Sequence, residues 1–263
     1  MASWFLLPHL AAVRIEGPDA LAFAHAQFTT SFQKNGIRSW CLTAWCDPRG
    51  RVLNLIVARS NESHVDLVVP ALQVQELVKR LRLYAIGRKI AIQHCASVAG
   101  NLCPGKDDET LAFDPGRSMA LNQQAPQDSE PMVLSWREAD IRAGVAWLGA
   151  ASSGQYLPQA LGLEDRGGLS YRKGCYPGQE IIARVHYLGK IKERLMGFVQ
   201  FEGPDSGTDE LEDQHGNRVG RILESVAASG RQIGLAVVAA DLDPGSMVRR
   251  SGHLVSLLPP ETL

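Results

Sequence analysis

The segment Lys173-Gly174-Cys175-Tyr176-Pro177-Gly178-Gln179-Glu180 constrains the local structure of this chain more than any other. Two glycines and a proline within eight residues do not suit the interior of a helix or a strand, because glycine loosens the backbone and proline lacks an N–H. Pro177 suits the first position of a helix, which predicts a helix that continues from Gln179 to Arg184. Cys175 would then lie just before the helix, where unpaired backbone N–H groups favour a thiolate.

Two interpretations of Cys175 are open. A lone cysteine is most often a small apolar residue of the core. Its neighbours favour a functional thiol instead, because Lys173 precedes it and further basic residues follow, namely Arg184, His186, Lys190, Lys192 and Arg194. Cys175 is therefore the first candidate for chemistry in this chain.

The composition bounds the class of protein. The chain has 263 residues, which is long for one compact domain and predicts two or three cores. With 45% hydrophobic and 21% charged residues it is typical of a soluble globular protein. No apolar run approaches the ~20 residues of a membrane span, so no membrane partner is expected. The net charge of −1 predicts no general attraction to nucleic acid.

Several kinds of site are disfavoured by what the sequence lacks. The five cysteines include no C-x-x-C pair, which predicts reduced thiols in the cytoplasm and no structural zinc or other metal site. There is no G-x-G-x-x-G segment, Walker loop, H-E-x-x-H motif or serine nucleophile elbow. Dinucleotide, nucleoside triphosphate and zinc-hydrolase functions are therefore poor hypotheses.

Strand and helix patterns alternate through the first part of the chain. Residues 39–45 and 51–58 read as strands joined by the turn Asp47-Pro48-Arg49-Gly50, and residues 71–85 have the apolar spacing of an amphipathic helix. After Lys192, short apolar runs alternate with Gly-, Asp- and Pro-rich turns, as in a small antiparallel barrel or sandwich. These patterns predict an α+β fold with a domain boundary near Gly189.

The octapeptide at 173–180 resembles the signature of the YgfZ-type folate-binding proteins, which are relatives of the aminomethyltransferase (T-protein) of the glycine cleavage system. The resemblance extends to the segments Gly154–Gln159, Gly167–Tyr171, Ile15–Ala20 and Cys46–Arg51. It implies an aminomethyltransferase-like fold with two intertwined α+β subdomains and a C-terminal antiparallel β-barrel domain around a folate cleft. We place the folate-binding α+β region at residues 1–188 and the barrel domain at residues 189–263.

The resemblance also implies residues that contact tetrahydrofolate or a one-carbon derivative of it. Asn54 lies in an apolar strand pattern, where a buried amide must find hydrogen-bond partners, and it aligns with an aspartate that acts in the chemistry of the aminomethyltransferases. An amide cannot take up a proton as a carboxylate does, so aminomethyl transfer is disfavoured. Trp136 stands where the family has a tryptophan associated with folate contact, the alternative being a core aromatic residue. Leu10 stands where relatives carry an aromatic residue and offers apolar packing only.

Further candidates come from the motif and its surroundings. Arg142 stands where the family usually has glutamate, and a guanidinium accepts no hydrogen bonds, so another acid such as Glu180 would have to orient the pterin. The basic residues around the motif form either a solvated surface or a site for the glutamate tail of folate or for RNA phosphates. From the motif we take Lys173, Gln179, Glu180 and Arg184 as folate-binding candidates.

The resemblance therefore predicts a cytoplasmic, tetrahydrofolate-binding accessory protein. It would support iron–sulphur enzymes or assembly proteins, including enzymes that modify tRNA, with Cys175 as the indispensable thiol. One alternative is a folate-dependent one-carbon transferase, which the amide at position 54 disfavours. A second alternative is a factor that binds tRNA directly, which the net charge near zero disfavours.

Overall fold

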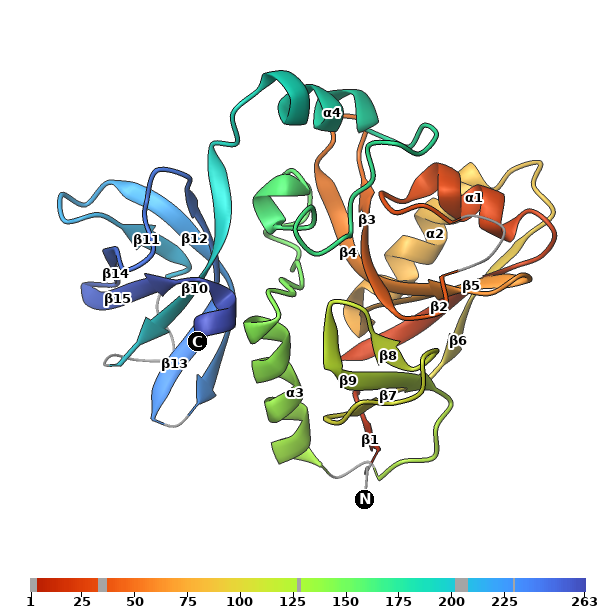
Figure 1. The fold of residues 1–263 in the computed structure, drawn as a ribbon, viewed down its shortest axis with the longest axis horizontal. Coiled ribbons are helices and arrows are strands. Elements are labelled where there is room, and N and C mark those ends of the chain that lie inside the picture. The colour runs from red at the N-terminus through yellow and green to blue at the C-terminus, as the bar shows by residue number, and fades with distance from the viewer. Residues whose placement is uncertain (1–3, 33–36, 127–128, 202–207, 229) are drawn as a thin grey trace.

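The computed structural model describes residues 4–32, 37–126, 129–201, 208–228 and 230–263. In that part of the chain, three β-sheets and four α-helices form an α+β body and a β-barrel that lies to one side of it (Figure 1). Helix α3 (Glu130–Arg142) runs between the two. The predicted α+β class with a C-terminal barrel is confirmed.

The first sheet of the body has five antiparallel strands in the order β3-β4-β5-β2-β6. The strands are β2 (Leu10–Glu16), β3 (Cys41–Cys46), β4 (Val52–Ser60), β5 (His64–Pro70) and β6 (Ala91–Ala96). Val13 and Ile15 of β2 share a core with helices α1 (Ala20–Gln27) and α2 (Val74–Tyr84), whereas Leu10 and Ala12 belong to the second core of the body. This division follows from the alternation of side chains along a strand.

The second sheet has four strands in the order β1-β7-β9-β8. They are β1 (Phe5–Leu6), β7 (Val98–Asn101), β8 (Thr110–Leu111) and β9 (Asp114–Leu121). Strand β1 comes first in the chain but pairs with β7, whereas β2, which follows it, pairs with β5 and β6 of the first sheet. The chain therefore passes back and forth between the sheets, so the two α+β units are intertwined.

The barrel is closed by six antiparallel strands in the order β10-β13-β12-β11-β14-β15. They are β10 (Glu193–Gln200), β11 (Glu210–Glu212), β12 (Arg218–Ala228), β13 (Arg231–Ala239), β14 (Met247–Arg250) and β15 (His253–Leu258). Met196 and Phe198 of β10 are in the barrel core, whereas Leu195 and Val199 belong to the same core cluster as Trp136 and Ile141 of α3. An apolar interface thus joins the barrel to the body.

Two further local sequence patterns mislead: Asp19 is a residue type that caps helices, and Asp114-Pro115-Gly116 has the composition of a hairpin turn. Asp19 precedes helix α1 but does not cap it with its side chain, because its carboxylate accepts a hydrogen bond from the Lys89 backbone N–H at 2.8 Å. The hairpin expected around Asp114-Pro115-Gly116 turns earlier, at residues 112–113, and those three residues begin strand β9. Pro115 is tolerated there because it lies at the beginning of β9, where the missing backbone N–H of a proline interrupts the strand pairing least.

The division of the chain at residues 188 and 189 remains a proposal. It falls between the end of helix α4 (Gln179–Leu188) and the start of strand β10. Among the described residues, no helix has both the length and the apolar character that crossing a membrane requires.

Candidate functional site

The motif at 173–180 packs on the turn between β3 and β4. Asp47 stabilises that turn, since its Oδ1 accepts hydrogen bonds from the backbone N–H groups of Arg49 and Arg51, both at 2.8 Å. Gly178 lies so close to it that a Cβ atom added there would be 2.5 Å from the Gly50 nitrogen and 2.6 Å from the Asp47 carbonyl oxygen. This close contact depends on the absence of a side chain at position 178.

Helix α4 begins at Gln179, two residues later than the proline suggested. Gly178 is the N-cap residue and has a φ of 79°, a left-handed conformation that separates Pro177 from the helix. The prediction that Pro177 occupies the first helical position is therefore wrong. Cys175 lies in the turn before this cap and not directly at the helix end, so the helix dipole acts on it less than expected.

Lys173 is buried, which its charge alone did not predict. Its Nζ donates hydrogen bonds to the backbone carbonyl groups of His25, Phe28 and Thr30 at the end of helix α1, and it lies 4.7 Å from the ring centre of Tyr176. Burial lowers the pKa of Lys173 to about 7, while the carbonyl acceptors favour the ammonium and act in the opposite direction. Lys173 thus anchors the motif to the body instead of facing a ligand.

Cys175 is exposed, as a functional thiol must be. Cys103 is exposed as well, so exposure does not single out Cys175 among the five cysteines. Cys46 is buried and Cys41 and Cys95 are partly buried, and burial raises the pKa of Cys41 to about 12 and also raises the pKa values of Cys46 and Cys95. Cys103 and Cys175 are therefore the two most accessible thiols of the folded protein.

A cavity of about 640 Å³ lies where the body, α3 and the barrel meet, and we call it the Asn54 cavity. Its apolar lining consists of Leu53, Pro70, Leu72, Leu77, Trp147, Leu148, Ala150 and Leu223, and its polar lining includes Asn54, Gln73, Glu76, Arg80, Arg137, Ser153, Glu224 and Ser225. A largely apolar cavity of this size with a few polar groups is typical of sites for small organic ligands.

A chain of amides holds Asn54 in place. The Nδ2 of Asn54 donates to the Oε1 of Gln73 at 2.7 Å, and the Nε2 of Gln73 donates to the backbone carbonyl of Leu148. Asn54 is 9% exposed, so its partners satisfy an amide that would otherwise be costly to bury. The prediction that this amide must find partners is confirmed, and Asn54 lines the cavity.

An ion pair closes the side of the cavity toward the barrel. Glu224 of β12 accepts hydrogen bonds from the Nε and Nη2 of Arg137 of α3, both at 3.3 Å. The Glu224 side chain is 11% exposed, and its Oε2 has no hydrogen-bond partner among the described residues. Burial, and then the charge of Asp140, raise the pKa of Glu224 to about 7, although Arg137 opposes this shift.

Replacement of Glu224 by glutamine is expected to change how stability depends on pH. The folded-state pKa of about 7 lies above the ordinary value of 4.5, so the protonated group contributes stability below about pH 4.5 that is lost as pH rises through 7. The free energy of unfolding of Glu224→Gln minus that of the wild type should rise by roughly 3 kcal/mol between pH 4.5 and pH 8. Urea denaturation at several pH values measures it. Glu212→Gln, at an exposed position of the same barrel, is the control, and a flat difference for Glu224→Gln would contradict the assignment.

Trp136 lies in the core and not in the lining of the Asn54 cavity. Its ring is 0% exposed, contacts Phe5 edge-to-face at 6.2 Å and lies 4.4 Å below the guanidinium of Arg117. The alternative of a core aromatic residue therefore describes its position. The indole that lines the cavity belongs to Trp147, whose Nε1 donates to the Oδ2 of Asp140 at 2.9 Å.

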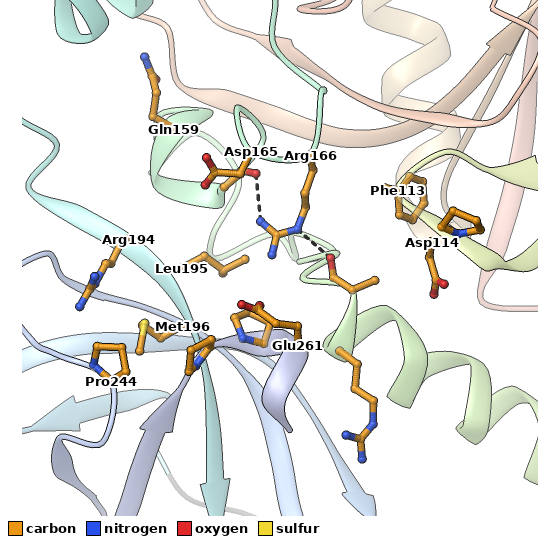
Figure 2. Close-up of a pocket in the computed structure, with 16 residues that line it drawn as sticks. Phe113, Asp114, Gln159, Asp165, Arg166, Arg194, Leu195, Met196, Pro244 and Glu261 are labelled. Atoms are coloured by element: carbon orange, nitrogen blue, oxygen red, sulfur yellow. Dashed lines mark hydrogen bonds between the residues drawn. The ribbon is translucent and has the colours of Figure 1, made fainter.

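Arg142 lines a different cavity, of about 780 Å³, which we call the Arg166 cavity. Figure 2 shows Arg166 in its middle, with Asp165, Arg194 and Glu261 around it. Arg166 donates to the carbonyl groups of Ala143 at 2.7 Å and Gly162 at 3.0 Å, and Arg142 pairs with Glu138 at 2.7 Å. The guanidinium at position 142 is thus absent from the lining of the Asn54 cavity, where Glu224 supplies a carboxyl group.

The structure does not bring the remaining candidates together. Leu10 is 4% exposed in the core of the body, and Gln179 donates from its side chain to the Lys173 carbonyl at 3.3 Å. Glu180 and Arg184 are exposed on α4 and line none of the cavities described here. Eight site residues were selected from the sequence, and of these Asn54 alone lines the Asn54 cavity.

Sequence reasoning missed Gln73, Arg137, Trp147 and Glu224 as site residues. Glu224 carried a usable signal, because a charged residue within an apolar strand pattern is as unusual as the asparagine at position 54. Trp147 stands within an apolar run, and such a run does not distinguish a core residue from a residue that lines a cavity. Arg137 and Gln73 lie on helical segments where a polar residue is ordinary.

Three comparisons bear on the identity of the chain. It is 26% identical over 283 residues to the tRNA-modifying protein YgfZ of Cronobacter sakazakii, with 91% of this chain and 85% of that protein covered. It is 27% identical over 282 residues to the tRNA-modifying protein YgfZ of Klebsiella pneumoniae, with 91% and 86% covered. No family profile matches the chain.

Among solved structures, the glycine cleavage system aminomethyltransferase T from Bartonella henselae matches with a TM-score of 0.76 at 16% identity. The match covers 100% of this chain and 86% of that one. The chain is therefore a distant homologue of the YgfZ proteins and has the fold of the T-protein, as the sequence motif predicted.

Proposed function

We propose that this distant homologue of YgfZ binds tetrahydrofolate, or a one-carbon derivative, in the Asn54 cavity and supports iron–sulphur enzymes through Cys175. The supported enzymes would include ones that modify tRNA, in keeping with the description of the two relatives as tRNA-modifying proteins. The observation that carries the proposal is the Asn54 cavity at the junction of body and barrel, combined with homology along most of the chain.

The lining of the Asn54 cavity suits a folate. The volume of about 640 Å³ lies within the range of drug-sized ligand sites. Trp147 and the leucines offer apolar surface to a flat ring system, and the amides of Asn54 and Gln73 offer hydrogen bonds to its edge. Glu224 and Arg137 add a carboxyl group and a guanidinium at the barrel side. Tetrahydrofolate would supply one-carbon or reducing chemistry when bound.

The alternative function is one-carbon transfer, which the likeness to the fold of an aminomethyltransferase suggests. Asn54 argues against it, because its amide is already engaged with Gln73 and cannot act as a base. Purified protein supplied with a lipoyl carrier and tetrahydrofolate is expected to form no appreciable methylenetetrahydrofolate. Robust product formation would favour the transferase.

Folate binding is tested by titration of the purified protein with tetrahydrofolate, followed by calorimetry. Gly149 lines the Asn54 cavity, and a Cβ atom there would meet nothing within 4 Å, so a large side chain can enter without disturbing the backbone. Gly149→Trp is expected to weaken binding at least tenfold by filling the cavity, whereas Gly149→Ala should bind like the wild type. Equal affinities in all three folded proteins would place the ligand elsewhere.

Cys175 is tested against Cys103, the other exposed cysteine. Iodoacetamide should label both in the native protein, because both are exposed. In cells that lack the protein, Cys175→Ser should fold normally yet fail to restore the activity of iron–sulphur tRNA-modifying enzymes. Cys103→Ser should restore it. Full restoration by Cys175→Ser would reduce the motif to a structural turn.

A further inference from the structure

Helix α4 follows the motif directly and leaves most of its surface uncovered. Figure 1 shows it at the upper edge of the molecule. Among its ten residues, all of which the structure describes, Ile182 is the buried one. Three apolar side chains of the helix are exposed, namely Ile181, Tyr187 and Leu188, and Leu188 is 85% exposed. Single exposed apolar residues are ordinary, but several of them on one short helix mark a candidate interaction surface.

The exposed apolar side chains share one face of the helix with an arginine. Ile181, Arg184 and Leu188 are three and four residues apart, so they are neighbours on the helix surface. Tyr187 lies at the edge of the same face, and Ile182 points to the opposite side. We call Ile181, Arg184, Tyr187 and Leu188 the α4 face. Its composition is that of a protein interface, where apolar anchors, tyrosine and arginine contribute most of the binding energy.

The opposite side of α4 is held firmly, which fixes the orientation of the α4 face. His186 stacks on Tyr171 with ring centres 3.9 Å apart, and its Nδ1 lies 2.9 Å from the Oε1 of Glu164. The Oε2 of the same carboxylate accepts a hydrogen bond from the Tyr171 hydroxyl at 2.9 Å. The ring of Tyr187 contacts that of His186 edge-on at 4.7 Å, yet Tyr187 is 66% exposed. The face is therefore ordered before a partner arrives, which lowers the entropic cost of docking.

The start of α4 is tied to the turn that carries Cys175. The backbone N–H of Gln179 donates to the Tyr176 carbonyl at 3.1 Å, and the Gln179 side chain donates to the Lys173 carbonyl at 3.3 Å. Cys175 lies between those two acceptors in the chain, so it adjoins the first turn of the helix. A helix of ten residues is about 15 Å long. One partner surface of standard size, about 800 Å², can therefore cover the thiol and the α4 face together.

The surroundings of the α4 face are positively charged. Over residues 172–192 the exposed charged residues are four basic ones and one acidic one, namely Arg172, Arg184, Lys190, Lys192 and Glu180. The whole chain has a net charge of −1, so this excess of positive charge is local. A positive rim around apolar anchors is complementary to a partner with acidic residues around an apolar groove, and it excludes partners with a basic surface.

We infer that the α4 face is the docking surface for the iron–sulphur tRNA-modifying enzyme that the protein supports, and that the enzyme presents an apolar groove with acidic residues around it. This inference rests on the proposed function. Cys175 can act on an enzyme only where the two proteins touch, so the surface beside the thiol must belong to the contact. Tyr187 and Leu188 are the apolar anchors, and Arg184 pairs with an acid of the enzyme.

The test measures binding of the full chain to a purified iron–sulphur tRNA-modifying enzyme by calorimetry, and restoration of that enzyme in cells that lack the protein. Arg184→Glu/Leu188→Glu is expected to weaken the complex at least tenfold and to restore no activity. Leu188→Ser, which keeps the charge, should weaken the complex less and in the same direction. Affinity for the wild type should fall as salt rises.

Ile86→Glu/Arg88→Glu is the matched control. It makes the same change of charge at an aliphatic residue that is 83% exposed and at an exposed arginine, both on another part of the body. It should bind and restore the enzyme like the wild type. Urea denaturation of all variants shows that each of them folds.

The outcomes separate the inference from the proposed function. If Arg184→Glu/Leu188→Glu leaves the complex intact, or if the wild type forms none, while Cys175→Ser still restores no activity, the inference is wrong and the proposed function stands. Full restoration by Cys175→Ser would overturn both. A complex with a second copy of the chain, with tRNA or with anionic vesicles that Arg184→Glu/Leu188→Glu abolishes, without any complex with the enzyme, would assign the α4 face to that occupant and refute the inference.

Discussion

Replacement of Gly178 by alanine is expected to destabilise the protein by roughly 3 kcal/mol or more. The left-handed conformation, with φ at 79°, costs a residue with a side chain about 1–2 kcal/mol. The new Cβ would also lie 2.5 Å from the Gly50 nitrogen and 2.6 Å from the Asp47 carbonyl oxygen. Those atoms belong to the backbone of a tight turn, and forcing them apart adds roughly 1–3 kcal/mol.

Gly167 provides the matched control for this experiment. It also has a left-handed conformation, with φ at 69°, but nothing lies within 4 Å of the place its Cβ would take. Gly167→Ala should therefore lose only about 1–2 kcal/mol, which is the conformational part. Urea denaturation of both variants measures the difference. Equal losses would mean that the motif does not press against the β3–β4 turn.

Replacement of Lys173 by methionine is expected to cost about 3 kcal/mol. Methionine keeps the length and the apolar stem but removes the ammonium that three carbonyl groups at the end of α1 share. Buried carbonyl groups left without donors lose roughly 1–3 kcal/mol each, and partial hydration reduces that sum. Thermal unfolding of the purified variant measures the loss.

Lys79→Met is the control for the lysine experiment, because Lys79 is exposed on helix α2. It should change the stability by less than about 0.5 kcal/mol. A stable Lys173→Met protein with weakened folate binding would restore the earlier expectation that Lys173 contacts the ligand. A destabilised protein that binds folate normally at low temperature would confirm that its role is to anchor the motif.

The local features of this fold followed from the sequence. The apolar spacing at 71–85 became helix α2, and Asp47 and Gly50 formed the predicted turn between β3 and β4. Local chemistry decides both, since a helical stripe and a turn depend on residues a few positions apart. Asn54 was selected as a candidate for the same reason, because an amide within an apolar strand is anomalous wherever the strand packs.

The tertiary structure alone decided which side chains meet. The Asn54 cavity joins residues 54, 73, 147 and 224, and no short pattern links positions so far apart. The two tryptophans near α3 looked alike in sequence, yet Trp136 packs under Arg117 in the core and Trp147 reaches the cavity. The reason is physical. A sequence pattern shows that a residue will be buried. The packing of the body against the barrel determines whether that residue lies inside a core or lines a cavity that a ligand can fill.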